Sequence, residues 1–123
     1  MSDRVRPLIL CRLDEIPEGE GRGFTLGQGS EQTLIAVFRQ GKRVHGYVNS
    51  CPHVGTPLDL IPDRFMTYDK RHILCATHGA RFRVYDGFCF AGPCHGQRLE
   101  PVPVGIADGM VILGGGTGSA ARA

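Results

Sequence analysis

The sequence predicts an all-β domain made of short strands joined by tight turns. Its 123 residues include 18 glycines and 8 prolines, and few of its segments favour a helix. The pairs Asp86-Gly87 and Asp108-Gly109 are strong turn signals that separate short apolar runs. A chain of this length is large enough for one hydrophobic core but too small for a second catalytic domain.

In the first half of the chain, a β-hairpin leads directly to a cysteine. The segment 33–38 (TLIAVF) is β-branched and apolar, as expected for a buried strand. A turn at 40–42 returns the chain as a second strand at 44–48, which ends just before Cys51. Before this hairpin we expect an opening strand at 5–13, a turn-rich loop at 14–19 and a short strand at 24–26.

The second half begins with a long segment, 57–74. It contains two prolines and, as far as Tyr68, shows neither a helical nor a strand-like spacing of apolar residues. We expect mostly loop there, with room for one helical turn. Short strands are predicted at 72–75, 80–84, 88–90, 102–106 and 110–113. The glycine-rich end, 114–123, is expected to be a flexible tail, so the predicted domain spans residues 1–113.

Composition argues against two classes of partner. The net charge of +2 gives no sign of a nucleic-acid surface. The longest apolar runs are four residues, too short for a membrane span or a secretory signal. We therefore expect a cytoplasmic protein that binds neither nucleic acid nor membrane.

Two short motifs carry the chemistry of the chain: Cys51-x-His53 and Cys75-x-x-His78. Two thiolates and two imidazoles from two loops suit a metal centre of mixed softness. In a [2Fe–2S] centre of the Rieske type, one iron takes two Cys and the other takes two His. A Cys₂His₂ zinc site groups its cysteines in one knuckle and its histidines in another, so zinc is the weaker alternative.

The remaining cysteines and histidines are expected to play ordinary parts. Cys11, Cys89 and Cys94 are predicted to be reduced thiols, with a Cys89–Cys94 disulfide as the minority alternative in a reducing compartment. The other histidines are expected at the surface or in ordinary hydrogen bonds: His45, His72 and His95. Arg81 and Arg83 are expected to form a solvated strand face.

The boxes at 51–56 (CPHVGT) and 75–82 (CATHGARF) resemble the two binding boxes of Rieske iron–sulfur domains, and Gly92-Pro93 resembles the loop that covers their cluster. The resemblance spans 8–113 and has a longer spacer than compact Rieske ferredoxins. It implies an antiparallel β-sandwich with a cluster-binding subdomain formed by two projecting loops. It also implies one [2Fe–2S] cluster per chain, held by Cys51, His53, Cys75 and His78.

The function implied by this resemblance is that of a soluble Rieske-type ferredoxin, as in bacterial oxygenase systems. Such a protein is a monomeric one-electron carrier from a reductase to a terminal oxygenase, with no catalytic residues of its own. Two alternatives stay open: a Rieske small subunit of a larger enzyme such as NAD(P)H nitrite reductase, and a zinc-stabilised binding module. A Rieske fold without metal is a further, weaker alternative.

The resemblance also bears on the reduction potential of the cluster. High-potential respiratory Rieske proteins have a disulfide at the positions of Thr56 and Thr77, and hydroxyl donors at those of Ala80 and Phe82. Neither feature is present in this sequence. Because donors to sulfur stabilise the reduced cluster, we expect a potential near the low end of the range of about −150 to +300 mV.

Overall fold

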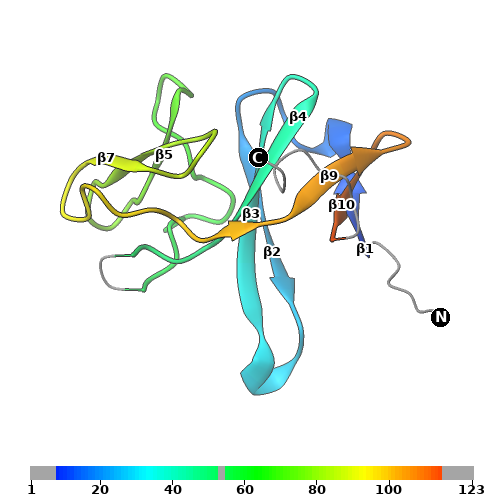
Figure 1. Cartoon of the computed structure of the whole chain (residues 1–123), viewed down its shortest axis with the longest axis horizontal. Coiled ribbons are helices and arrows are strands. Elements are labelled where there is room, and N and C mark those ends of the chain that lie inside the picture. The colour runs from blue at the N-terminus through cyan, green and yellow to red at the C-terminus, as the bar shows by residue number, and fades with distance from the viewer. Residues whose placement is uncertain (1–7, 53–54, 115–123) are drawn as a thin grey trace.

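The computed structural model describes residues 8–52 and 55–114, and within them the regular structure is β-strand apart from two short 3₁₀ turns. Three antiparallel sheets contain the strands (Figure 1). The first sheet has the order β1-β10-β9, made of Leu8–Arg12, Met110–Leu113 and Val104–Ala107. The second has the order β2-β3-β4-β8, made of Gly21–Leu26, Thr33–Gln40, Arg43–Val48 and Pro101–Val102. The third has the order β5-β6-β7, made of His72–Leu74, Arg81–Arg83 and Cys89–Ala91. The predicted all-β sandwich with a separate small subdomain is confirmed.

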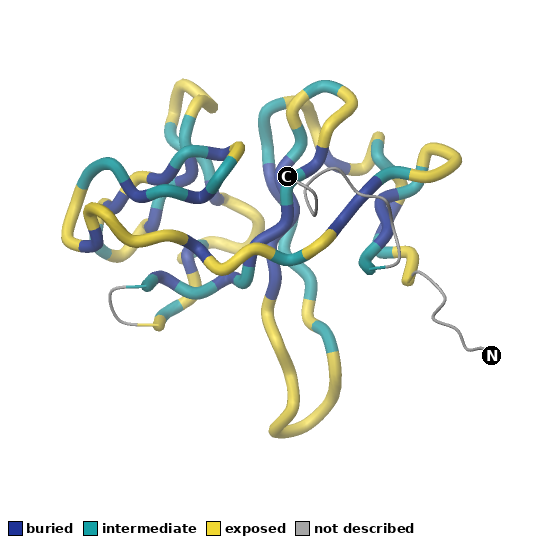
Figure 2. Tube along the Cα trace, in the orientation of Figure 1, coloured by how far each residue is buried: buried dark blue, intermediate teal, exposed yellow. Residues whose placement is uncertain are grey.

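Strand β3 is buried on both faces and lies between two hydrophobic cores. Ile35 and Val37 belong to a core shared with the first sheet, whereas Ala36 and Phe38 belong to a second core that contains four cysteines. Successive side chains of a strand point to opposite faces, which is how one strand serves two cores. Figure 2 shows this buried centre, while residues 27–34 at the tip of the β2–β3 hairpin are exposed.

The predicted strand at 102–106 is wrong as a single element. Pro103 divides it, so that β8 pairs with β4 in the second sheet and β9 pairs with β10 in the first. A proline has no N–H to donate and cannot continue a ladder on that side. The break therefore lets the chain cross from one sheet to the other.

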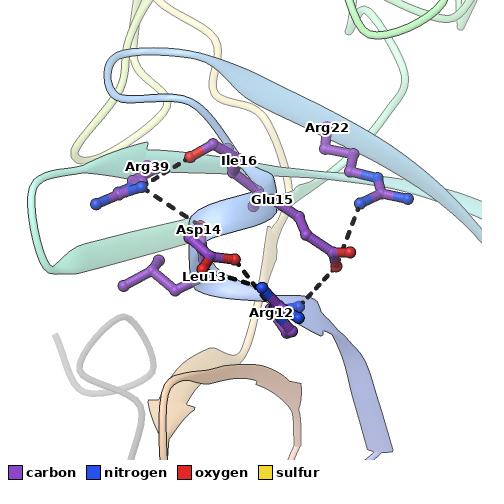
Figure 3. A network of polar contacts seen from close by, with 7 residues as sticks. All are labelled: Arg12, Leu13, Asp14, Glu15, Ile16, Arg22 and Arg39. Atoms are coloured by element: carbon purple, nitrogen blue, oxygen red, sulfur yellow. Dashed lines mark hydrogen bonds and ion pairs between the residues drawn. The ribbon is translucent and has the colours of Figure 1, made fainter.

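The predicted loop at 14–19 begins instead with a 3₁₀ turn, η1 (Leu13–Glu15), and a second such turn, η2 (Gly29–Glu31), lies in the β2–β3 hairpin. Figure 3 shows how polar contacts hold η1 in place. The Arg12 backbone N–H donates to the Glu15 carboxylate at 2.9 Å, and the Arg39 guanidinium donates to the Ile16 carbonyl at 3.0 Å. Arg39 thus fastens η1 to β3.

The long spacer is ordered by one buried polar side chain rather than by a helical turn, which the structure does not contain there. Asn49 is 7% exposed; its carbonyl oxygen accepts from the Leu58 N–H at 2.7 Å, and its amide donates to Asp59 at 2.9 Å. Asp59 in turn accepts from the Asp63 N–H, and the Asp63 carboxylate accepts from the Gly23 N–H on β2. This chain of hydrogen bonds ties the spacer to the second sheet.

Some expected features fall outside the described residues: His53, Val54, the first residues of the opening strand (5–7) and tail residues 115–123. Among the described residues, no helix is long and apolar enough to cross a lipid bilayer.

Candidate metal centre

Two loops with the same local hydrogen bonds carry the predicted ligands. The first follows β4, and the second joins β5 to β6. In the first loop the Cys51 N–H donates to the Thr56 carbonyl at 2.8 Å, and the Gly55 N–H donates to the Cys51 carbonyl at 2.6 Å. In the second, Cys75 makes the matching bonds with Ala80 at 2.8 Å and Gly79 at 2.8 Å. The two boxes are therefore closed by the same pair of hydrogen bonds, although their histidines stand at different offsets from the cysteine in the sequence.

Glycine is required once in each loop by the backbone conformation. Gly55 has φ +82° and Gly79 has φ +75°, in the left-handed region that residues with a Cβ rarely adopt. Each glycine lies where its loop closes, because its N–H donates to the carbonyl of the cysteine that begins the box.

The structure brings three of the four predicted ligands together. The Sγ atoms of Cys51 and Cys75 and one ring nitrogen of His78 lie within 4.8 Å of one another. The Cys75 Sγ is 4.0 Å from the His78 Nδ1. Both cysteines are fully buried, and His78 is partly buried. The fourth predicted ligand, His53, lies outside the described residues.

Polar groups around these side chains suit a metal-bound thiolate. Burial raises the pKa of the Cys75 thiol, while the backbone N–H groups of His78 and Thr77 act in the opposite direction by hydrogen bonding to its sulfur. Such N–H donors stabilise thiolate ligands. The Thr56 hydroxyl is also buried and has no hydrogen-bond partner among the described residues. The donor set and its surroundings therefore fit a soft metal centre.

A third loop closes over the second ligand loop. Gly92 has φ +98°, and a Cβ placed on it would lie 2.6 Å from the Ala80 Cα. Only glycine allows this approach, which positions Pro93 and Cys94 beside the site. The predicted covering role of the Gly92-Pro93 loop agrees with this contact.

The sequence analysis missed Cys94 as a neighbour of the site. Its side chain is fully buried, and its Sγ is 3.4 Å from the Cys89 Sγ. Burial, together with the adjacent Cys89 and Cys51 thiols, raises the pKa of Cys94 to about 12. The signal that was available is the position of Cys94 directly after the covering Gly-Pro pair.

The other histidines of the described residues do not belong to the group formed by Cys51, Cys75 and His78. The His72 ring packs edge-on against Phe90 with centroids 4.7 Å apart, and the His95 ring lies 6.4 Å from that of Phe88. Burial lowers the pKa of His45, whose Nε2 has no partner among the described residues.

Arg81 is exposed, as expected for a solvated strand face. Arg83 departs from that expectation, because its guanidinium pairs with Asp86 and stacks over Tyr85 and Phe88. It therefore stabilises the turn after β6.

A comparison with protein families matches residues 6–106 to the Rieske [2Fe–2S] domain. The chain belongs to the Rieske [2Fe–2S] domain family. The cofactor of this family is a [2Fe–2S] cluster, and the grouped cysteines and histidine are side chains of the kind that hold its metal. A comparison with curated protein sequences finds no match.

Solved structures show that this Rieske domain has the fold of several ferredoxins. The ferredoxin of carbazole 1,9a-dioxygenase from Nocardioides aromaticivorans IC177 is 23% identical with a TM-score of 0.70, covering 89% of this chain and 97% of its own. The Sphingomonas yanoikuyae B1 ferredoxin is 26% identical with a TM-score of 0.65, covering 88% and 97%. A complex of reduced oxygenase and oxidised ferredoxin in carbazole 1,9a-dioxygenase contains a chain 24% identical with a TM-score of 0.69, covering 87% and 91%.

Proposed function

We propose that this Rieske domain is a ferredoxin that carries one electron from a reductase to a terminal oxygenase. The observation that carries this proposal is the pair of matching loops that bring Cys51, Cys75 and His78 together in a chain nearly coextensive with ferredoxins. The domain extends in this proposal to Leu113, where the last strand ends. The protein acts as a carrier and not as a catalyst.

Four side chains hold the cluster in this proposal: Cys51, His53, Cys75 and His78. The cluster, when bound, supplies a one-electron couple, and replacing two thiolates by neutral imidazoles makes its reduction easier. The protein residues exclude water from the cysteine side, because both thiols are fully buried. Backbone N–H groups of Thr77 and His78 offset the negative charge on the Cys75 sulfur.

Ligation is tested on protein purified without oxygen. The wild type should hold two irons and two acid-labile sulfides per chain and be red-brown. Alanine at any one of the four ligand positions should abolish or severely alter the visible spectrum, whereas Cys11→Ala, far from the site in the other core, should leave it intact. A colourless protein that holds zinc instead would overturn the proposal.

Partner docking is proposed at the end of the domain where His78 reaches the surface. Exposed, uncharged side chains lie in or next to the two ligand loops and the covering loop: Pro57, Ala76, Thr77 and Pro93. Electron-transfer contacts are small and transient, so one added charge within them has a large effect. The neighbouring ferredoxin–oxygenase complexes support an oxygenase as the acceptor class.

A charge substitution tests this docking surface. Thr77→Glu should slow electron transfer to the oxygenase, measured as product formed per NAD(P)H consumed with a reductase–oxygenase pair. Thr25→Glu is the matched control, because Thr25 is also exposed but lies on β2 and not in a ligand loop. Equal rates for the two variants would contradict docking at this end.

A carrier that exchanges freely between partners should sediment as a monomer and be recovered from the cytoplasmic fraction.

A further inference from the structure

An exposed turn at residues 59–64 carries two large apolar side chains next to the second ligand loop. Leu60 is 72% exposed and Ile61 is 56% exposed, although they closely follow Leu58, which is fully buried in the core that contains the proposed cysteine ligands. The Ala76 N–H of the second ligand loop donates to the Leu58 carbonyl at 3.0 Å. The turn is therefore continuous with the end of the domain where docking of the oxygenase is proposed.

Hydrogen bonds on both sides hold this turn in one conformation. Asp59 accepts from the Asn49 amide at 2.9 Å and from the Asp63 N–H at 3.0 Å. Inside the turn, the Arg64 N–H donates to the Ile61 carbonyl at 2.9 Å. A surface that is already ordered loses less conformational entropy when a partner binds to it. The two apolar side chains are thus presented without the ordering cost of a flexible loop.

The charged side chains of the turn differ in their availability to a partner. Both carboxylates are used within the protein: Asp59 in the contacts above, and Asp63 as acceptor of the Gly23 N–H at 2.8 Å. Arg64 is exposed, and no ion pair joins its guanidinium to a carboxylate in the described part of the chain. The turn therefore offers two apolar side chains and one positive charge. An apolar depression bordered by a carboxylate is the surface that complements it.

We propose that the oxygenase binds this turn, with Leu60 and Ile61 in an apolar depression of its surface and Arg64 facing a carboxylate at the edge. The inference rests on the proposed function as an electron carrier to an oxygenase, and it adds the spacer to the docking surface. Leu60 and Ile61 supply affinity, because association removes their apolar surface from water. Arg64 supplies orientation and a faster encounter, which are the usual contributions of a complementary charge.

The test follows a single electron transfer by stopped-flow absorbance. Cluster-loaded protein, reduced with dithionite, is mixed with increasing concentrations of the oxygenase for which the coupled assay shows product formation with the wild type. The dependence of the reoxidation rate on oxygenase concentration gives two quantities. The half-saturating concentration measures docking, and the limiting rate measures the transfer itself.

Removing either apolar side chain should weaken docking alone. Leu60→Ser and Ile61→Ser should each raise the half-saturating concentration about 5- to 30-fold, the effect of losing one such contact, with the limiting rate and visible spectrum unchanged. Ile9→Ser is the matched control, because Ile9 is 57% exposed but lies on β1 in the first sheet. Its half-saturating concentration should equal that of the wild type.

Reversing the charge of Arg64 should weaken docking in a way that depends on salt. Arg64→Glu should raise the half-saturating concentration at low ionic strength, and added salt should change it less than it changes the wild-type value. Arg43→Glu alters the net charge by the same amount at an exposed position on β4. This control should have a smaller effect, because Arg43 lies outside the proposed contact.

The outcomes separate this inference from the function on which it rests. A half-saturating concentration unchanged in Leu60→Ser and Ile61→Ser would overturn the inference and leave the carrier function intact. An equal increase in Ile9→Ser, or equal effects of Arg64→Glu and Arg43→Glu, would also overturn it, because the effect would not belong to this turn.

Two further results would overturn the inference in other ways. Slower reduction of the oxidised variants by a reductase, with unchanged reoxidation by the oxygenase, would mean that the turn binds the reductase instead. If no oxygenase accepts electrons from the wild type, the proposed function itself fails and this inference fails with it.

Discussion

Replacing Gly92 by alanine should open the covering loop and speed loss of the cluster. The added Cβ would stand 2.6 Å from the Ala80 Cα and 3.1 Å from its backbone nitrogen, and φ +98° is strained for any residue with a side chain. Backbone atoms cannot rotate away as a flexible side chain can. The clash between the added Cβ and Ala80 is therefore relieved only if the Gly92 loop and the second ligand loop separate.

Gly96 provides a control with the same backbone cost and no collision. Its φ is +93°, and a Cβ there meets nothing within 4 Å. Both alanine variants incur the conformational strain of about 1–3 kcal/mol. Only Gly92→Ala adds overpacking, which typically costs about 1–3 kcal/mol. The difference between the two variants isolates the contact between the loops.

The assay is the first-order rate at which visible absorbance bleaches in the presence of an iron chelator. If this contact is lost before the transition state for opening, a difference of about 1–3 kcal/mol makes Gly92→Ala bleach about 5- to 150-fold faster than Gly96→Ala. Iron content at the start confirms that both variants assembled. Equal bleaching rates would refute the argument that this close approach holds the site closed.

Three further perturbations test the scaffold around the site. Tyr47→Phe removes the hydroxyl that donates to the buried Val84 carbonyl at 2.6 Å, so the free energy of unfolding in urea should fall by about 1–3 kcal/mol. Asn49→Ala leaves the Leu58 N–H without its side-chain acceptor, and proteolysis of the spacer should become faster than in the wild type. Burial holds the pKa of His45 below its ordinary value of about 6.5, so protonation favours the unfolded state: stability is full above that pH and falls as the pH drops through it. In His45→Leu the melting temperature, recorded from neutral pH downward, should fall less steeply with pH than in the wild type. An equal fall in both proteins would mean that another group causes the loss of stability in acid.

The ligand loops were predictable because everything that shapes them is local. Each box places a cysteine and a left-handed glycine within six residues, and the closing hydrogen bonds join residues four and five positions apart. The hairpin of β3 and β4 was predictable for the same reason, since its turn and its apolar strand residues are adjacent in sequence. Short-range chemistry therefore indicated the fold class and the candidate ligands, three of which the structure brings together: Cys51, Cys75 and His78.

Other features depended on contacts between segments distant in sequence. Nothing near Asn49 indicates that its amide will hold the spacer, because its partner Asp59 is brought there only by folding. The division of the last predicted strand at Pro103 likewise required knowing that each half has a different sheet to join.

Cys94 shows most clearly what could not be predicted from the sequence. By sequence alone it was a spare thiol, and its spacing from Cys89 pointed only to a minor disulfide alternative. Packing of Gly92 on Ala80 places it in the same buried core as Cys51. The residues of each ligand loop were thus fixed by their own sequence, whereas the tertiary structure decided which polar and sulfur groups surround them, because hydrogen bonds and burial between distant segments exist only once the sheets have packed.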